Sequence, residues 1–270
     1  MMPRLVVARC RRVHPLLHRF LPFAAVAVLA CMPACARAAD PVAAGSDPSA
    51  LALADSVMQG LGGKAAWDKA KYIAFDFVVS RHDTTLNRRS LRWDRATDRM
   101  RIEGKDGKGR TYVILTDMAH KSGVTKLDGA PADSATHAAL LERAYQIWVN
   151  DTYWMLMPYK LRDPGVHLAD AGVDATGRLR VLALSFDKVG LTPGDRYWVY
   201  IDPKTHLVSR WEMLLQSNKD GVKTVVGWTD WHEYDGIQLA GRRPFEDGSI
   251  EIRMENITVA PAPPAGAFDS

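Results

Sequence analysis

Turn-forming dipeptides constrain the fold of this chain more than any other feature. Asp-Gly pairs begin at five positions, Asp106, Asp128, Asp220, Asp235 and Asp247. Such a pair between alternating segments predicts a β-hairpin, because glycine tolerates the positive φ that a tight hairpin turn requires. Parallel strands need crossovers of about a dozen residues or more, for which 178–259 leaves no room. The chain is therefore predicted to form an antiparallel sheet.

Segments with strand-like and helix-like spacing complete this prediction. Strands are expected at 72–80, 89–94, 98–103, 111–116, 178–186, 195–202, 206–215, 222–234 and 248–259. Helices are expected after Asp47-Pro48, which offers a cap and a first-turn proline, and over 134–149, where apolar residues form one stripe. The predicted class is α+β: a strongly curved antiparallel sheet, a half-barrel of about 8–11 strands, wrapped around a few helices.

The first 38 residues have the layout of a secretory signal peptide. They carry six arginines and no acidic residue, and Phe20–Cys31 is uncharged. This apolar run is shorter than the ~20 residues that span a bilayer, and Ala36-Arg37-Ala38 provides small residues for cleavage. Without the signal, 29 basic residues (35 − 6) face 31 acidic ones. The mature charge of −2 argues against nucleic acid as a partner.

All three cysteines, Cys10, Cys31 and Cys35, lie in this segment. Cleavage after Ala38 therefore predicts a mature chain without thiol catalysis, cysteine-based zinc sites or disulfides. Val28-Leu29-Ala30-Cys31 also resembles a lipobox, in which Cys31 would be lipidated and become the mature N-terminus. The two processing routes remain alternatives at this stage. The predicted organisation is a signal peptide at 1–38, a linker at 39–48, one domain at 49–259 and a disordered tail at 260–270.

Three sequence blocks are more distinctive than the alternating strand pattern, which many protein families share. They are Leu61-Gly62-Gly63-Lys64 followed by Trp67, the block from Asn150 through Trp154 to Val166, and Val189–Asp195 running into Tyr197–Asp202. They resemble the bacterial lipoprotein-carrier (LolA/LolB-like) superfamily, closest to an uncharacterised envelope-protein family on that fold. Over roughly 51–259, the resemblance implies a half-barrel with a hydrophobic cavity that in the carriers receives acyl chains. It supplies no transferable site residues.

Catalytic and metal motifs are absent from the sequence pattern. The mature histidines are scattered without helical pair spacing, no Gly-x-Ser-x-Gly motif occurs, and no glycine-rich phosphate loop follows a strand. We therefore expect no metal site, no cofactor and no enzymatic activity. The alternatives left open are an envelope hydrolase whose site is assembled only in the fold, and a lipid-anchored structural lipoprotein.

Tryptophan, tyrosine and methionine supply the candidate binding residues. Any one of these side chains is adequately explained as a core residue. Together, they suit an interior that the helices fill only in part and that can accept an apolar ligand. The predicted ligand-binding residues are Trp93, Trp148, Tyr153, Trp154, Met157, Trp198, Trp211 and Trp228. The expected ligand is a hydrophobic small molecule, a lipid or a lipoprotein acyl chain. The expected location is the periplasm or the outer membrane, with peripheral or lipid-anchored membrane contact.

Overall fold

The computed structural model describes residues 46–82 and 84–269. The predicted signal peptide, its cleavage site and Cys31 lie outside these residues. Within them, no helix is both long enough and apolar enough to cross a membrane. The domain limits inferred from the sequence stay predictions.

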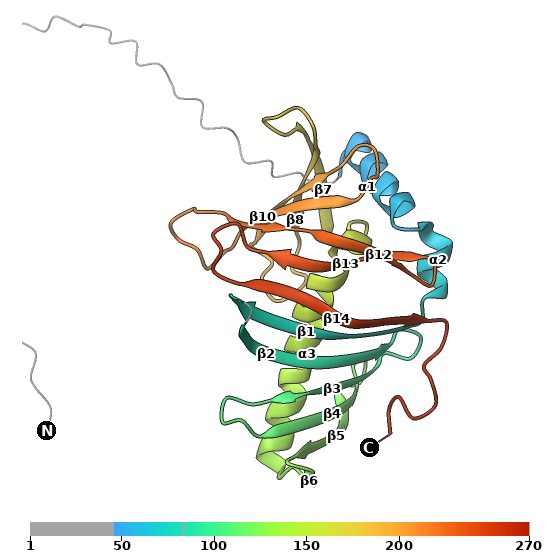
Figure 1. Cartoon of the computed structure of the whole chain (residues 1–270), viewed down its shortest axis with the longest axis vertical. Coiled ribbons are helices and arrows are strands. Elements are labelled where there is room, and N and C mark those ends of the chain that lie inside the picture. The colour runs from blue at the N-terminus through green and yellow to red at the C-terminus, as the bar shows by residue number, and fades with distance from the viewer. Residues whose placement is uncertain (1–45, 83, 270) are drawn as a thin grey trace, which may run out of the picture. The chain divides into compact units, whose positions relative to one another are not determined.

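Helices are few and strands are many (Figure 1). The helices are α1 (Pro48–Gly60), α2 (Gly63–Lys69), α3 (Ser134–Leu156) and the 3-10 helix η1 (Met157–Lys160). The first six strands are β1 (Tyr72–Arg81), β2 (Thr84–Asp94), β3 (Arg99–Lys105), β4 (Thr111–Asp117), β5 (Ser122–Leu127) and β6 (Ala130–Pro131). The remainder are β7 (Val166–Val173), β8 (Arg180–Phe186), β9 (Arg196–Ile201), β10 (Val208–Leu214), β11 (Thr224–Gly227), β12 (Thr229–Tyr234), β13 (Ile237–Pro244) and β14 (Glu251–Ala260).

The strands form two antiparallel sheets rather than one. A nine-stranded sheet has the order β12-β13-β14-β1-β2-β3-β4-β5-β6, and a five-stranded sheet has the order β11-β10-β9-β8-β7. Register shifts in β1 at Ala74/Asp76 and at Val79/Ser80 are irregularities of the kind that bend a strand. The predicted α+β class with a curved antiparallel sheet is confirmed, and neither sheet closes into a barrel.

The chain changes sheets at Trp228. The sequence predicted one strand over 222–234, whereas β11 ends at Gly227 in the five-stranded sheet and β12 begins at Thr229 in the nine-stranded one. Trp228 is 1% exposed, and its backbone N–H donates to the carbonyl of Ser209. A bulky side chain buried at the crossover holds the two sheets together, which alternation along the sequence does not reveal.

Strands β5, β6, β7 and β13 were not predicted. β13 contains Gly241 and ends in Arg242-Arg243-Pro244, a composition with little β character. At Gly241 an added Cβ would lie 2.4 Å from a carboxylate oxygen of Asp230, so the Asp230 side chain would have to move. Strand β13 forms through its pairing with β12 and β14 rather than through local propensity.

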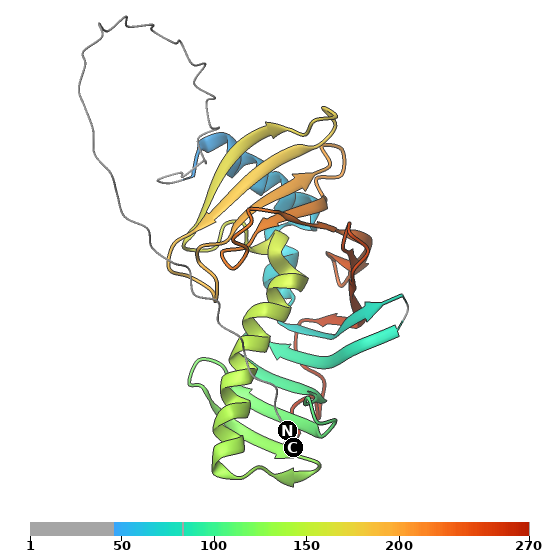
Figure 2. The ribbon, with the colours of Figure 1, turned by 90° about the vertical axis from the view of Figure 1, so that its left-hand side faces the viewer.

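Helix α3 runs along the inner face of the nine-stranded sheet and continues to the five-stranded one (Figure 2). The face that it covers carries a register-aligned row of buried residues, in which Phe75, Leu91, Ile102 and Ile114 are neighbours across β1–β4. The helix was predicted to end near Val149, and it extends to Leu156. The row beneath it fills the space between the helix and this sheet.

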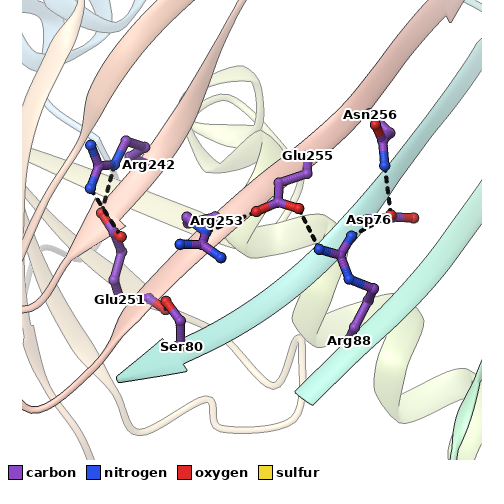
Figure 3. Close-up of polar contacts among 8 residues, drawn as sticks. All are labelled: Asp76, Ser80, Arg88, Arg242, Glu251, Arg253, Glu255 and Asn256. Atoms are coloured by element: carbon purple, nitrogen blue, oxygen red, sulfur yellow. Dashed lines mark hydrogen bonds and ion pairs between the residues drawn. The ribbon is translucent and has the colours of Figure 1, made fainter. Parts of the chain in front are cut away.

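Charged side chains pair with one another on the opposite face of the same sheet. In Figure 3, Arg88 of β2 bridges Asp76 of β1 (2.7 Å) and Glu255 of β14 (2.5 Å), in front of α3. Arg253 joins Glu255 at 2.9 Å, and Arg242 joins Glu251 at 2.7 Å. Acidic and basic groups alternate across the strands, so this face neutralises its own charge and is expected to stay in water.

The segment after β14 contacts the nine-stranded sheet. Phe268 packs edge-on against Tyr72, with ring centroids 6.4 Å apart, and the guanidinium carbon of Arg99 lies 4.8 Å from the Phe268 ring centroid. An aromatic side chain in a segment of small residues thus finds an aromatic and cationic partner on β1 and β3.

Asp47 caps α1, as the sequence predicted, and also ties it to β7. One carboxylate oxygen accepts the N–H of Ala50 at 2.6 Å, and the other accepts the N–H of Asp170 at 2.9 Å. These backbone donors lower the pKa of Asp47 below 3.8. A lowered pKa contributes stability above the unfolded value and loses it as pH falls through the folded value. We expect Asp47→Ala to lower the melting temperature at neutral pH, and the difference from wild type to vanish in acid. Thermal melts across this pH range test it, and a pH-independent difference would contradict the assignment.

Candidate ligand-binding cavity

A cavity of about 610 Å³ lies between the C-terminal half of α3 and the five-stranded sheet. This volume falls within the range of small-molecule sites, roughly 300–1,000 Å³. The sequence placed the hollow between a single curved sheet and its helices. The structure places it on the side of α3 that faces the second sheet, because the row of large side chains on β1–β4 occupies the first.

One face of α3 forms the first wall. Its residues recur at intervals of three and four, so they lie on one side of the helix. The members of this face are Tyr145, Trp148, Val149, Thr152, Tyr153 and Leu156, and Asn150 and Trp154 line the cavity from outside it. The helix continues through Asn150-Asp151 because Asp151 has an ion-pair partner inside the fold and Thr152 donates to the carbonyl of Trp148 at 2.6 Å. This continuation brings Tyr153 and Leu156 to the cavity.

The five-stranded sheet forms the second wall. Trp211 and Met213 alternate inward along β10, and Tyr197 of β9 and Thr224 of β11 lie on the neighbouring strands. Val166, the first residue of β7, lines the far side of the same wall. Successive inward positions on a strand are two residues apart, so the pleat itself selects these side chains.

An aromatic cluster centred on Trp211 joins these walls. Its ring centroid lies 4.8 Å from that of Trp154, 4.9 Å from Tyr197 and 5.9 Å from Tyr153. The Trp154 ring stacks against Phe245 at 6.0 Å. These contacts join α3 to β9, β10 and the end of β13, and tilted aromatic pairs of this kind add to the area that they bury.

A buried carboxylate interrupts the aromatic lining. Asp195 is 3% exposed and accepts hydrogen bonds from the hydroxyls of Thr192 (2.7 Å) and Tyr197 (2.9 Å). Its second oxygen accepts the N–H of Gln216 at 2.8 Å. These donors satisfy the carboxylate, and they connect the segment before β9 to the segment after β10.

Two of the three tyrosines that line the cavity, Tyr153 and Tyr197, stay protonated in the physiological range. Burial raises the pKa of Tyr153 well above its ordinary value, and burial together with the nearby Asp195 raises the pKa of Tyr197. A phenol with a raised pKa donates a hydrogen bond and does not act as a base near neutral pH. The tyrosines therefore contribute area and hydrogen bonding.

The other polar groups of the lining differ in their pairing. The indole N–H groups of Trp93, Trp148 and Trp211 have no hydrogen-bond partner among the described residues. Lys160 of η1 forms an ion pair with Asp163, three residues along the chain.

Among the described residues that line the cavity, none is histidine, serine or cysteine. No group of three metal-ligating side chains occurs in the described part of the chain. The described lining therefore holds no Ser-His or Cys-His pair, and its hydroxyl–carboxylate contacts are those of Thr192 and Tyr197 with Asp195.

A buried ion pair docks α3 onto the nine-stranded sheet behind the cavity. Arg89 of β2 donates from Nε and Nη2 to the carboxylate of Asp151 at 2.8 and 2.9 Å. The Asp151 side chain is fully buried, and Asn150 donates to it at 2.8 Å. Burial raises the pKa of Asp151 despite these partners. The pair fixes the position of the helix without fully offsetting the cost of removing the carboxylate from water.

Arg243 holds a second part of the helix. This side chain of β13 is fully buried, and its Nε donates to the carbonyl of Trp154 at 3.2 Å. Its Nη1 donates to the carbonyl of Ala240 at 2.8 Å, and its guanidinium carbon lies 4.0 Å from the ring centroid of Trp228. Burial lowers the pKa of Arg243. Its contacts fix the backbone of Trp154, whose indole lines the cavity.

Five of the eight sequence-predicted binding residues line the cavity. They are Trp93, Trp148, Tyr153, Trp154 and Trp211. Trp93 of β2 reaches the cavity beside the helix and packs edge-on against Trp148, with ring centroids 5.9 Å apart. The structure thus brings together residues from β2, α3 and β10, while their contact with a ligand stays a prediction.

The other three predicted residues lie elsewhere. Met157 is fully buried in η1. Trp198 points away from the cavity because its neighbour Tyr197 points inward, and the ammonium of Lys223 lies 3.6 Å from its ring centroid. Trp228 packs behind Trp211 at the crossover between the sheets. We therefore assign these three to structural roles.

Several lining residues escaped the sequence analysis. Tyr145 lies one helical turn before Trp148, and Tyr197 alternates with Val199, so both could have been found from periodicity. Phe245 follows the unpredicted β13, and Phe186 ends β8. Their place in the cavity depends on how the two sheets meet, which local pattern does not specify.

Comparisons with known proteins give distant structural likenesses. No family model and no curated protein matches the chain. Among solved structures, a LolA-superfamily protein from Nitrosomonas europaea is 9% identical, with a TM-score of 0.45 over 80% of this chain and 97% of that one. A putative outer-membrane lipoprotein-sorting domain from Vibrio parahaemolyticus is 11% identical, with a TM-score of 0.43 over 82% and 96%. A DUF1329-family protein from Desulfovibrio piger is 12% identical, with a TM-score of 0.42 over 79% and 94%. The first of these belongs to the superfamily that the sequence blocks resemble, and we transfer no residue role from them.

Proposed function

We propose that the protein is an exported envelope protein that binds or carries an apolar ligand, such as a lipid or an acyl chain, without catalysis. The observation that carries this proposal is the cavity of about 610 Å³ lined by aromatic and aliphatic side chains. Export is supported by the arginine-rich start, the short apolar run and the small-residue cleavage motif of the first 38 residues. The proposed location is the periplasm.

The lining suits a flexible hydrocarbon better than a compact polar metabolite. Trp211, Trp154 and Tyr197 offer flat surfaces, while Met213 and Leu215 can change conformation around a guest. Each methylene group that leaves water contributes about 0.8 kcal/mol to binding, so a chain of several methylenes binds without any specific polar contact. Thr192 and Asp195 already bond to each other, so they make no demand on the ligand.

The experiment is a binding measurement on the mature protein produced in a bacterial periplasm. Native mass spectrometry reports any lipid that copurifies. After delipidation, titration with cis-parinaric acid, a fluorescent polyunsaturated fatty acid, should quench the tryptophan emission of the cavity. A ligand at about a hundred times its Kd should stabilise the fold by roughly 2.7 kcal/mol. We therefore expect a rise in melting temperature of several degrees. Protein that emerges empty and shows neither quenching nor a thermal shift would contradict a carrier.

A further inference from the structure

Two loops lie side by side at one end of the five-stranded sheet. The first spans 187–195 between β8 and β9, and the second spans 215–223 between β10 and β11 (Figure 2). The N–H of Gly194 donates to the side-chain oxygen of Gln216 at 2.9 Å, and the N–H of Gln216 donates to Asp195 at 2.8 Å. These bonds join the loops into one surface. The hairpin turns at 174–179 and 202–207 lie at the opposite end of the antiparallel strands.

Three aliphatic side chains on these loops are exposed to water. Val189 is 39% exposed, Leu191 is 46% exposed and Val222 is 63% exposed. Val189, Gly190 and Leu191 also line the cavity. Side chains that line a cavity and are exposed at the same time lie at its mouth. Val189 and Leu191 are therefore continuous with the proposed ligand site, and Val222 lies on the loop that is hydrogen-bonded to theirs.

The charges of the two loops balance. At the surface, Lys188, Lys219 and Lys223 stand against Asp187 and Asp220, and Glu212 of β10 balances the third lysine. Asp187 contacts His167 at 2.8 Å, and Lys223 pairs with Glu212 at 3.0 Å. A surface with no net charge has little electrostatic attraction for an acidic or basic partner, so its aliphatic tips are its main means of attachment.

We propose that loops 187–195 and 215–223 form a membrane-docking surface that inserts Val189, Leu191 and Val222 shallowly into a phospholipid bilayer. This inference rests on the proposed function, because a bilayer at the cavity mouth lets an apolar ligand move between membrane and cavity without crossing water. Separate aliphatic tips on two loops suit the disordered interior of a bilayer, where no complementary shape is needed. A protein partner would require a wider surface, of roughly 800 Å² on each side.

Flotation with vesicles of phosphatidylethanolamine and phosphatidylglycerol tests the proposal. Wild-type mature protein should float with the vesicles at low and at high salt, because the attachment is apolar. Val222→Asp should reduce the bound fraction about tenfold, since it replaces an inserted valine with a charge. Val173→Asp is the matched control: Val173 is 58% exposed at the end of β7, beside the opposite hairpin turn, and this variant should bind as wild type does.

Val222 does not line the cavity, so Val222→Asp should retain full affinity for cis-parinaric acid in solution. Binding to vesicles without binding of cis-parinaric acid would contradict the proposed function and still support the membrane contact. Wild-type protein that stays in the aqueous fraction, equal losses in both variants, or release by high salt would overturn the membrane contact alone. A dimer that Val222→Asp dissociates, without vesicle binding, would assign this surface to a second copy and also overturn the proposal.

Discussion

Replacing Asp151 by alanine is expected to lower the free energy of unfolding by about 3–5 kcal/mol. The substitution leaves the Arg89 guanidinium, whose side chain is 12% exposed, without its carboxylate. For a domain of this size, each kcal/mol lowers the melting temperature by about 2–4 °C, so a loss on the order of 10 °C should be seen. Denaturant unfolding and thermal melts measure the effect. The matched control is Asp55→Ala, which removes the exposed partner of Arg162 and should cost at most about 1 kcal/mol.

Replacing both Arg89 and Asp151 by apolar residues separates the cost of an unpaired buried charge from the contribution of the ion pair itself. The pKa of Asp151 is raised by burial, so the folded state favours the protonated carboxyl. A raised acid pKa contributes stability below the unfolded value and loses it as pH rises through the folded value. Replacing a buried ion pair by apolar side chains of similar volume is often neutral or stabilising, so Arg89→Met/Asp151→Leu should recover most of the stability lost in Asp151→Ala. A double variant as unstable as the sum of its single variants would contradict this account.

The sequence predicted that the strands pair antiparallel, but it did not predict that they divide into two sheets. Asp-Gly pairs with short intervening segments leave no other arrangement, and the cap at Asp47 and the start of α3 at Ser134 are local features. The change of sheet at Trp228 depends on contacts between residues far apart in the chain. The extension of α3 past Asn150 depends on Arg89, which comes about 60 residues earlier and gives Asp151 a partner inside the fold.

The sequence predicted which residue types line the cavity, but it did not predict where in the fold the cavity lies. Tryptophan and tyrosine on the periodic faces of α3 and β10 indicated an aromatic interior, and five of the eight predicted residues line the hollow. Trp198 and Trp228 have the same chemistry and lie outside it, because the pleat of β9 and the crossover between the sheets direct their side chains elsewhere. Residue type identifies candidates, and the packing of the two sheets decides among them.

Filling the cavity from its helical wall should weaken ligand binding without unfolding the protein. In Val149→Trp, an indole replaces a side chain on the α3 face that lines the hollow. If the indole displaces two or three methylene groups of the guest, the affinity for cis-parinaric acid should fall by roughly 2 kcal/mol, or about thirtyfold. Thr224→Trp tests the same space from β11 on the opposite wall.

The melting temperature of the variants distinguishes a loss of ligand affinity caused by filling the cavity from one caused by damage to the fold. An indole that enters an existing hollow gains apolar contacts, so the melting temperature of the delipidated variants should equal or exceed that of wild type. The same substitution at an exposed position, Val173→Trp, should leave probe affinity unchanged because Val173 lies outside the cavity. If Val149→Trp and Thr224→Trp fold stably and bind the probe as wild type does, the ligand lies elsewhere. The space between α3 and the five-stranded sheet would then be a packing feature of the fold.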